Sequence, residues 1–280
     1  MARTLVITGG TNGIGLVLAR HHSERGDQVI AIGSSPSGGD RLRREAPEAR
    51  FVQADLSSVK QTNELTDHLL SAHPAIDALV LAAFRYHPSR TETGEGFERT
   101  FALYVVNRWL MSRALRPALE NAPAPMILDL CGVGGVKASK IHWDDLQLER
   151  GYRPFKATMQ GARAAELLAT AYAADPVRYV LYNPLFVATG LSEPFRQPVR
   201  GLVKLASALF AQPVSKAVRP MTALIDNPRL PRSPRTSEAS PPPSPPTRPR
   251  PAASTPPSAT WCPLSPPDLL HPHRAGWLEV

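Results

Sequence analysis

A glycine-rich stretch near the start of the chain has the residue types that hold a phosphate. Residues Thr8–Gly15 read TGGTNGIG and follow a short apolar run. Glycine permits a tight turn, lets the backbone approach a diphosphate, and lets the next helix pack on the strand while its N-terminus supplies N–H donors. The stretch lies after an expected strand, opens an expected helix and is followed by another strand, which is the context this motif requires. It therefore predicts a dinucleotide site, the alternative being a tight turn that binds no ligand.

A tyrosine and a lysine four residues apart, Tyr152 and Lys156, have the chemistry to move a proton. A free phenol has a pKa of about 10 and is a poor proton donor at neutral pH. Residues four apart on one helix share a face, so the lysine cation would favour the phenolate and lower that pKa. The phenol could then give a proton to a carbonyl oxygen as hydride reaches the carbon, or take it back. The alternative is an ordinary contact on a helix surface.

The elements that must position these residues alternate along the chain. Strands are expected where β-branched and apolar residues cluster, and helices where apolar residues recur at helical spacing. The expected strands are residues 4–8, 28–33, 50–53, 75–83, 125–130 and 178–182, and the expected helices are residues 13–25, 58–72, 97–121, 153–173, 201–212 and 215–226. This alternation predicts an α/β fold, a single Rossmann-like doubly wound parallel sheet in three α/β/α layers.

The order of these motifs resembles the short-chain dehydrogenase/reductase family in its classical TGxxxGIG and YxxxK form, over residues 3–226. The resemblance implies an NAD(P)-dependent oxidoreductase that transfers hydride between the nicotinamide and a carbonyl or secondary alcohol. Tyr152 is then the general acid/base, Lys156 lowers its pKa and binds the nicotinamide ribose, and Asn107 holds a water linked to Lys156.

The same resemblance assigns contacts to the cofactor. Asp55-Leu56 after the third expected strand looks like the segment that binds the adenine amino group, and Pro184, Val187 and Thr189 look like the segment that contacts the nicotinamide carboxamide. The full set of expected cofactor-binding residues is Gly9, Thr11, Asn12, Gly13, Ile14, Gly15, Ser34, Ser35, Asp55, Leu56, Ala82, Ala83, Asn107, Tyr152, Lys156, Pro184, Val187 and Thr189.

Three positions depart from the family pattern. Gly132 stands where the family has a serine that orients the substrate carbonyl, and removing one such donor commonly costs about 3–4 kcal/mol. Phe84 replaces a glycine beside Ala82 and Ala83, whose small side chains still admit a cofactor, and Leu185 replaces another glycine. These changes leave open a non-catalytic relative that binds the dinucleotide as a sensor or scaffold.

The end of the second expected strand bears on the choice of cofactor. An acidic residue there would bind the ribose 2′-hydroxyl and select NAD. The chain instead has Ser34 and Ser35, followed by Arg41, Arg43 and Arg44. Hydroxyls with nearby cations suit a 2′-phosphate, so we expect NADP, with NAD as the alternative.

The last part of the chain differs in composition from the rest. Sixteen of the 30 prolines lie between Pro228 and Pro272. We therefore expect residues 1–226 to form the NAD(P)-binding domain and residues 227–280 to be a disordered Pro/Arg/Ser-rich tail. The tail has no β-branched run, which predicts six strands, with the seventh missing or replaced. The sixth strand is then expected to be an exposed edge of the sheet unless Gly276–Val280 covers it. A C-terminally damaged enzyme is a further alternative.

Composition also excludes several classes of function. The formal net charge of +8 is scattered, which argues against nucleic-acid binding. Cys131 and Cys262 form no CxxC or Cys/His cluster, so neither a disulfide framework nor a metal site is expected, and a cytoplasmic location is the default. The longest apolar run, Ala78–Phe84, is too short to span a bilayer. We expect a soluble protein acting on a small-molecule carbonyl or alcohol, without nucleic-acid or membrane partners, and homo-oligomeric as is typical of the family.

Overall fold

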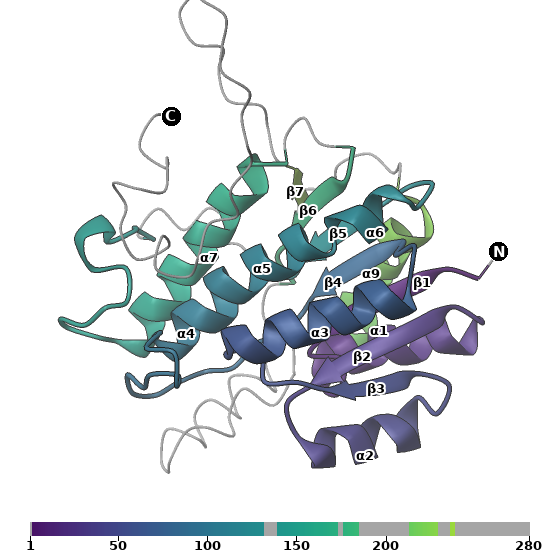
Figure 1. Ribbon diagram of the computed structural model, residues 1–280, viewed down its shortest axis with the longest axis horizontal. Helices are drawn as coiled ribbons and strands as arrows, with labels where there is room; N and C mark the ends of the chain where they lie inside the picture. The colour runs from purple at the N-terminus through teal and green to yellow at the C-terminus, as the bar shows by residue number, and fades with distance from the viewer. Residues whose placement is uncertain (1, 132–138, 173–175, 185–212, 229–235, 239–280) are drawn as a thin grey trace, which may run out of the picture. The chain divides into compact units, whose positions relative to one another are not determined.

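The computed structural model describes residues 2–131, 139–172, 176–184, 213–228 and 236–238. Within these ranges the chain forms a seven-stranded sheet of order β3-β2-β1-β4-β5-β6-β7 (Figure 1). The strands are β1 (Thr4–Thr8), β2 (Gln28–Gly33), β3 (Arg50–Gln53), β4 (Ala78–Leu81), β5 (Met126–Asp129), β6 (Arg178–Tyr182) and β7 (Thr236–Glu238). The first six are parallel, which confirms the predicted doubly wound α/β fold.

Helices cover both faces of the sheet. Side chains alternate between the two faces along each strand, so a strand that is apolar throughout presents apolar side chains on both faces. Leu5 and Ile7 of β1 belong to the core on one face, and Val6 belongs to the core on the other. The first core takes residues from α1 (Gly13–Glu24), α2 (Pro36–Glu45) and α9 (Val214–Asp226), and the second takes residues from α3 (Val59–Ala72), α5 (Asn107–Ala114), α6 (Arg116–Glu120) and α7 (Pro154–Thr170). Strands buried on both faces read as continuous apolar runs, which made them recognisable. No helix in the described ranges combines the length and apolar character needed to cross a membrane.

The long helix predicted over residues 97–121 is divided into segments. α4 (Arg99–Phe101) leads into a π-helical segment, η1 (Ala102–Val106), which is followed by α5 and α6. A π-helical turn closes on i→i+5 hydrogen bonds and so holds more residues than an α-turn. It therefore changes which side chains face the sheet, and a 3.6-residue period does not predict that orientation.

One edge of the sheet differs from the prediction. The prediction that the sixth strand is an exposed edge is wrong, because β7 pairs antiparallel with β6 and places Ser237 opposite Leu181. The pairing uses backbone N–H and C=O groups, which need no apolar run, and β7 lies in a proline-free stretch between Pro234 and Pro241. The rest of the proline-rich segment, including Gly276–Val280, lies outside the described residues, as does the helix expected at residues 201–212.

A cluster of charged side chains links α9 to the start of β1. Arg3 Nη2 lies 2.6 Å from Asp27 Oδ2 and 2.8 Å from Asp226 Oδ1, and Arg3 Nη1 donates to the backbone carbonyl of Ile225 at 2.8 Å. The buried His22 places Nδ1 3.1 Å from Asp27 Oδ2. Burial lowers the pKa of His22, and the hydrogen bond with Asp27 only partly opposes this effect.

Candidate functional site

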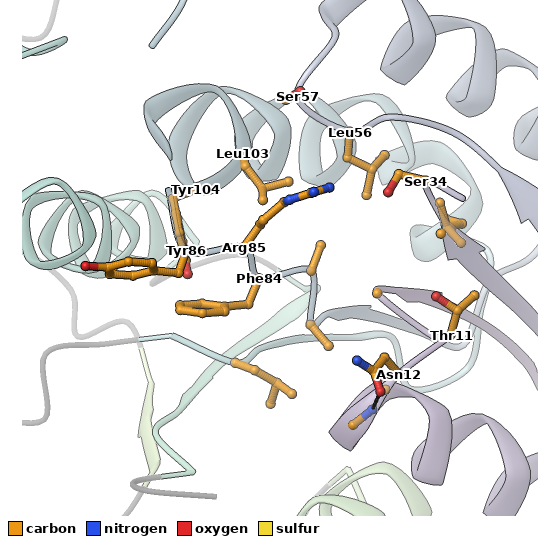
Figure 2. Close-up of a pocket in the computed structure, with 18 of the residues that line it drawn as sticks. Thr11, Asn12, Ser34, Leu56, Ser57, Phe84, Arg85, Tyr86, Leu103 and Tyr104 are labelled. Atoms are coloured by element: carbon orange, nitrogen blue, oxygen red, sulfur yellow. Dashed lines mark hydrogen bonds between the residues drawn. The ribbon is translucent and has the colours of Figure 1, made fainter. Parts of the chain in front are cut away.

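A cavity of about 1060 Å³ lies at the carboxyl ends of the parallel strands, and Figure 2 shows part of its lining. Each of the six parallel strands is followed by a lining residue: Gly9, Ser34, Asp55, Ala82, Leu130 and Asn183. Ligands of open α/β sheets bind in the crevice outside these strand ends. The cavity is therefore the candidate site.

The glycine turn forms the middle of the cavity wall. Gly9 has φ of +66°, and a Cβ there would lie 2.9 Å from the carbonyl oxygen of Ala82. The Thr8 hydroxyl oxygen accepts hydrogen bonds from the backbone N–H groups of Ala82 and Ala83, at 3.0 and 3.1 Å, and so joins the ends of β1 and β4. Asn12 caps α1 by accepting from the N–H of Gly13 at 2.9 Å. The expected residues Gly9, Thr11, Asn12, Gly13, Ile14, Gly15, Ala82 and Ala83 all line the cavity.

Beyond β2 the wall carries hydroxyl groups and a cation. Ser34, Ser35, Ser37 and Arg41 line this end. Ser35 also caps α2, its side-chain oxygen accepting from the N–H of Gly38 at 3.2 Å. The expected Arg43 is not among the described lining residues, nor is Arg44, and Arg43 pairs with Asp40.

Asp55 and Leu56, expected near the adenine, line the cavity after β3. Asp55 Oδ1 accepts from the backbone N–H and the hydroxyl of Ser57, at 3.0 and 2.7 Å, which fixes the carboxylate. Among the described lining residues Asp55 is the one carboxylate, whereas Arg41, Arg85 and Arg99 are cations. This balance of charge suits a ligand with several phosphates.

The Tyr152–Lys156 pair is not arranged as predicted. α7 begins at Pro154, so Tyr152 precedes the helix and does not share a helix face with Lys156. Proline is favoured in the first turn of a helix and disfavours helical backbone in the residue before it, and Arg153 is indeed extended, with φ of −138° and ψ of 133°. The expectation of one helix carrying both side chains is therefore wrong.

The Tyr152 hydroxyl is held by groups other than Lys156. It donates to the backbone carbonyl of His87 at 3.0 Å and lies 3.4 Å from Thr100 Oγ1. Its pKa is raised above the ordinary value, mainly because the ring is partly removed from water, and is not lowered as predicted. Neither Tyr152 nor Lys156 is among the described lining residues, although His87 is.

Asn107 is also directed away from the cavity. It is 2% exposed, and its Nδ2 donates to Thr62 Oγ1 of α3 at 3.2 Å. Tyr104, three residues earlier in η1, lines the cavity instead. The asparagine assigned to a catalytic water thus joins α5 to α3 in the described structure.

The far end of the cavity is formed by residues that sequence reasoning did not assign. Leu103 and Tyr104 of η1 and Thr158, Met159 and Ala162 of α7 all line the cavity. Thr158 and Ala162 are four residues apart in the predicted helix over residues 153–173, so their shared face was the signal that could have found them. Cys131, Asn183 and the expected Pro184 complete this end, and the expected positions Gly132, Leu185, Val187 and Thr189 lie outside the described residues.

A buried ion pair lies next to this end. Arg108 Nη1 contacts Asp129 Oδ1 at 2.5 Å, and the hydroxyl of Tyr179 donates to Asp129 Oδ2 at 2.7 Å. Arg108 is 2% exposed and Asp129 is fully buried. The guanidinium also lies 4.9 Å from the ring centroid of Tyr104. The pair therefore fixes α5 and η1 against β5 and β6.

Comparison with known proteins adds to this geometry. The family model described as short chain dehydrogenase matches residues 3–199. The human dehydrogenase/reductase SDR family member 12 is 28% identical over 163 residues, which are 56% of this chain and 50% of that protein. Mouse retinol dehydrogenase 13 is 25% identical over 177 residues, 60% of this chain and 52% of that protein. The chain thus spans about half the length of these curated relatives.

Solved structures share the fold. The chain resembles the Pseudomonas aeruginosa RhlG/NADP active-site complex with a TM-score of 0.62 and 19% identity, over 80% of this chain and 90% of that one. A short-chain dehydrogenase from Streptomyces avermitilis gives a TM-score of 0.61 with 19% identity, over 82% and 86% of the two chains.

Proposed function

The chain belongs to the short chain dehydrogenase family, and from that premise we propose that it is an NADP-preferring oxidoreductase that moves hydride between the nicotinamide and a carbonyl or secondary alcohol. The observation that carries this proposal is the continuous cavity across the carboxyl ends of all six parallel strands, from Ser34 and Arg41 to Tyr104 and Asn183. A dinucleotide needs such an extended site, with its diphosphate near the centre.

The residues present fit the parts of that cofactor. The N-terminus of α1, from Gly13, opens at the centre of the cavity, where helix N–H groups favour a diphosphate. Asp55 and Leu56 would hold the adenine, and Ser34 with Arg41 would hold a 2′-phosphate. The bound cofactor would supply the hydride.

The single experiment that tests cofactor binding is a thermal-shift titration of the full chain with NADPH and with NADH. A ligand that binds the native state selectively raises the melting temperature with its concentration. We expect a larger rise with NADPH. No rise with either nucleotide would contradict the proposal, and an equal rise would contradict only the preference for NADP.

Tyr152 is our candidate proton donor. Its hydroxyl donates to the carbonyl of His87, a residue that lines the cavity, and would have to leave that carbonyl to reach a substrate. Catalytic hydrogen bonds often tighten only when substrate binds, so this geometry is compatible with the role. We expect Tyr152→Phe to lower kcat by about 100-fold or more with unchanged affinity for NADPH. Unchanged turnover would remove Tyr152 from the mechanism.

A non-catalytic dinucleotide-binding relative is the second candidate. It is favoured by the absence of Tyr152, Lys156 and Asn107 from the described lining of the cavity. Such a protein would bind NADPH tightly and yet would not oxidise it with any member of a panel of ketones and quinones. NADPH oxidation in that panel would exclude it.

A further inference from the structure

Tyr104 has a buried hydroxyl that the described part of the chain does not satisfy. The side chain lines the cavity and is 2% exposed, its Oη exposes less than 1 Å², and it has no hydrogen-bond partner among the described residues. Buried polar groups in native structures are nearly always paired, so an exception calls for an explanation such as an ordered water, a ligand or a catalytic role.

The position of Tyr104 indicates which part of a dinucleotide it would meet. Tyr104 packs in a small buried cluster with Cys131, Ala162 and Ala165, at the β5 side of the cavity. The predicted phosphate-binding Ser34 lies at the β2 side, and the glycine turn lies between them. A dinucleotide whose adenosine lies near β2 and β3 would therefore place its nicotinamide riboside beside Tyr104.

The surrounding residues fix the Tyr104 ring. A Cβ at Gly161 of α7 would lie 2.9 Å from the Tyr104 Cβ, so α7 packs closely on the base of the side chain. Arg108, held by Asp129, lies against one face of the ring. The Phe84 ring packs edge-to-face on Tyr104 at 5.6 Å between centroids, and Figure 2 shows the Tyr104 side chain directed toward it.

The hydroxyl is suited to donate rather than to ionise. Burial raises the pKa of Tyr104 well above its ordinary value, although the nearby Arg108 cation opposes this effect. The phenol therefore keeps its proton at neutral pH. Phe84, which packs against it, is 49% exposed, so its side chain can turn away without opening the core.

We propose that Tyr104 donates a hydrogen bond to an oxygen of the nicotinamide riboside half of the cofactor, either the carboxamide carbonyl or a ribose hydroxyl. This assignment rests on the proposed function. It also makes Phe84 the side chain that must move when the cofactor binds, because its ring packs against Tyr104 at the cavity wall.

Tyr104→Phe tests the assignment, because it removes only the hydroxyl and keeps the packing of the ring. We expect calorimetric titration to show NADP⁺ binding weakened by about threefold to tenfold, the effect of one neutral hydrogen bond. The melting temperature without ligand should stay the same or rise, because no described residue forms a hydrogen bond with the lost hydroxyl. Tyr182→Phe is the matched control: Tyr182 is also buried, and its Oη has no partner in the described ranges, but it is not among the described lining residues, so loss of its hydroxyl should leave NADP⁺ affinity unchanged.

Two truncated ligands locate the acceptor. If Tyr104→Phe loses affinity for NADP⁺ but not for 2′-phospho-ADP-ribose, the hydrogen bond is assigned to the carboxamide. If it loses affinity for NADP⁺ and for 2′-phospho-ADP-ribose but not for adenosine 2′,5′-bisphosphate, the bond is assigned to the ribose. Equal NADP⁺ affinity in Tyr104→Phe and the wild type would overturn the inference, as would a loss that persists with adenosine 2′,5′-bisphosphate. Failure of the wild type to bind NADP⁺ and NADPH would instead overturn the proposed function, and this inference with it.

Discussion

Gly9 and Arg41 act on the cavity by different physical means. Gly9 allows β1 to turn toward α1 while its backbone touches the end of β4, so its contribution is steric. Arg41 places a cation near Ser34 and Ser35, so its contribution is electrostatic and depends on the ligand. Substitution of the two should therefore give different signatures, one in protein stability and the other in cofactor choice.

Gly9→Ala should destabilise the protein more than Gly26→Ala does. Both glycines have positive φ, +66° and +84°, so each alanine would meet backbone strain of about 1–2 kcal/mol. An added Cβ at Gly9 would also lie 2.9 Å from the backbone of Ala82 and Ala83, whereas nothing lies within 4 Å of one at Gly26. Urea unfolding of both variants measures the difference, and equal midpoints would show that the contact at Gly9 relaxes freely.

Arg41→Gln should weaken NADPH binding while leaving NADH binding unchanged. A hydrogen bond to a charged group contributes about 1.5–3 kcal/mol, so the loss should be about 10-fold to 100-fold. Arg43→Gln is the control, because Arg43 is near in sequence but pairs with Asp40 and is not among the described lining residues. Equal losses for NADPH and NADH in Arg41→Gln would exclude a contact with the 2′-phosphate.

At the scale of the elements, the segment from α4 to α6 decides the chemistry of the far end of the cavity. The π-helical segment η1 places Tyr104 in the cavity and leaves Asn107 against α3. Arg108 then enters the interior, where Asp129 at the end of β5 neutralises it. This buried ion pair thus holds α5 against β5.

Arg108→Met should destabilise the protein by about 3–5 kcal/mol, because it leaves the Asp129 carboxylate buried without its cation. Adding Asp129→Leu to that variant should recover much of the loss, since the uncompensated charge is then gone. Arg116→Met is the surface control: it breaks the exposed pair with Glu120 and should cost about 0.5 kcal/mol or less. Denaturant unfolding of the four proteins would show the pattern, and a full loss in the double variant would contradict it.

At the scale of the whole folded unit, the cluster of Arg3, His22, Asp27 and Asp226 joins segments that lie far apart in the sequence. Arg3 stands before β1, His22 and Asp27 flank the end of α1, and Asp226 ends α9. The hydrogen bonds of this cluster require an unprotonated Asp27, and burial favours a neutral His22. We therefore expect the stability of the fold to depend on pH.

Stability should fall as the pH drops from about 7 to 5.5. The pKa of folded His22 is lowered below its unfolded value of about 6.5, so the unfolded chain takes up the proton first. Proton binding lowers the free energy of the unfolded state relative to the native state, and the native state is destabilised. The loss begins near the unfolded pKa, continues until the folded pKa is passed, and has a slope of no more than about 1.4 kcal/mol per pH unit. His22→Gln should show a smaller loss in urea unfolding at the two pH values, and an identical loss would exclude His22 as the source.

The apolar runs of the sequence predicted the strands that are buried on both faces, and the TGGTNGIG stretch predicted a phosphate site. Both depend on short-range properties: strands buried on two faces must be apolar throughout, and a tight turn into a helix needs glycine. Ser34 and Ser35 were likewise recognisable, because they follow directly from the end of β2, whereas the sequence did not separate Arg41 from Arg43 and Arg44.

Only the tertiary structure decided which side chains of η1 and α7 face the cavity. Pro154 moved the start of α7 past Tyr152, and the π-helical segment directed Tyr104 rather than Asn107 inward. The pairing of β7 with β6 was also decided there. A helix rotates its side chains by about 100° per residue, so one widened turn changes every contact that follows it, and a helix that begins only at Pro154 leaves Tyr152 outside it. Backbone pairing at a sheet edge does not require an apolar side-chain pattern, and that is why the sequence wrongly predicted an exposed sixth strand.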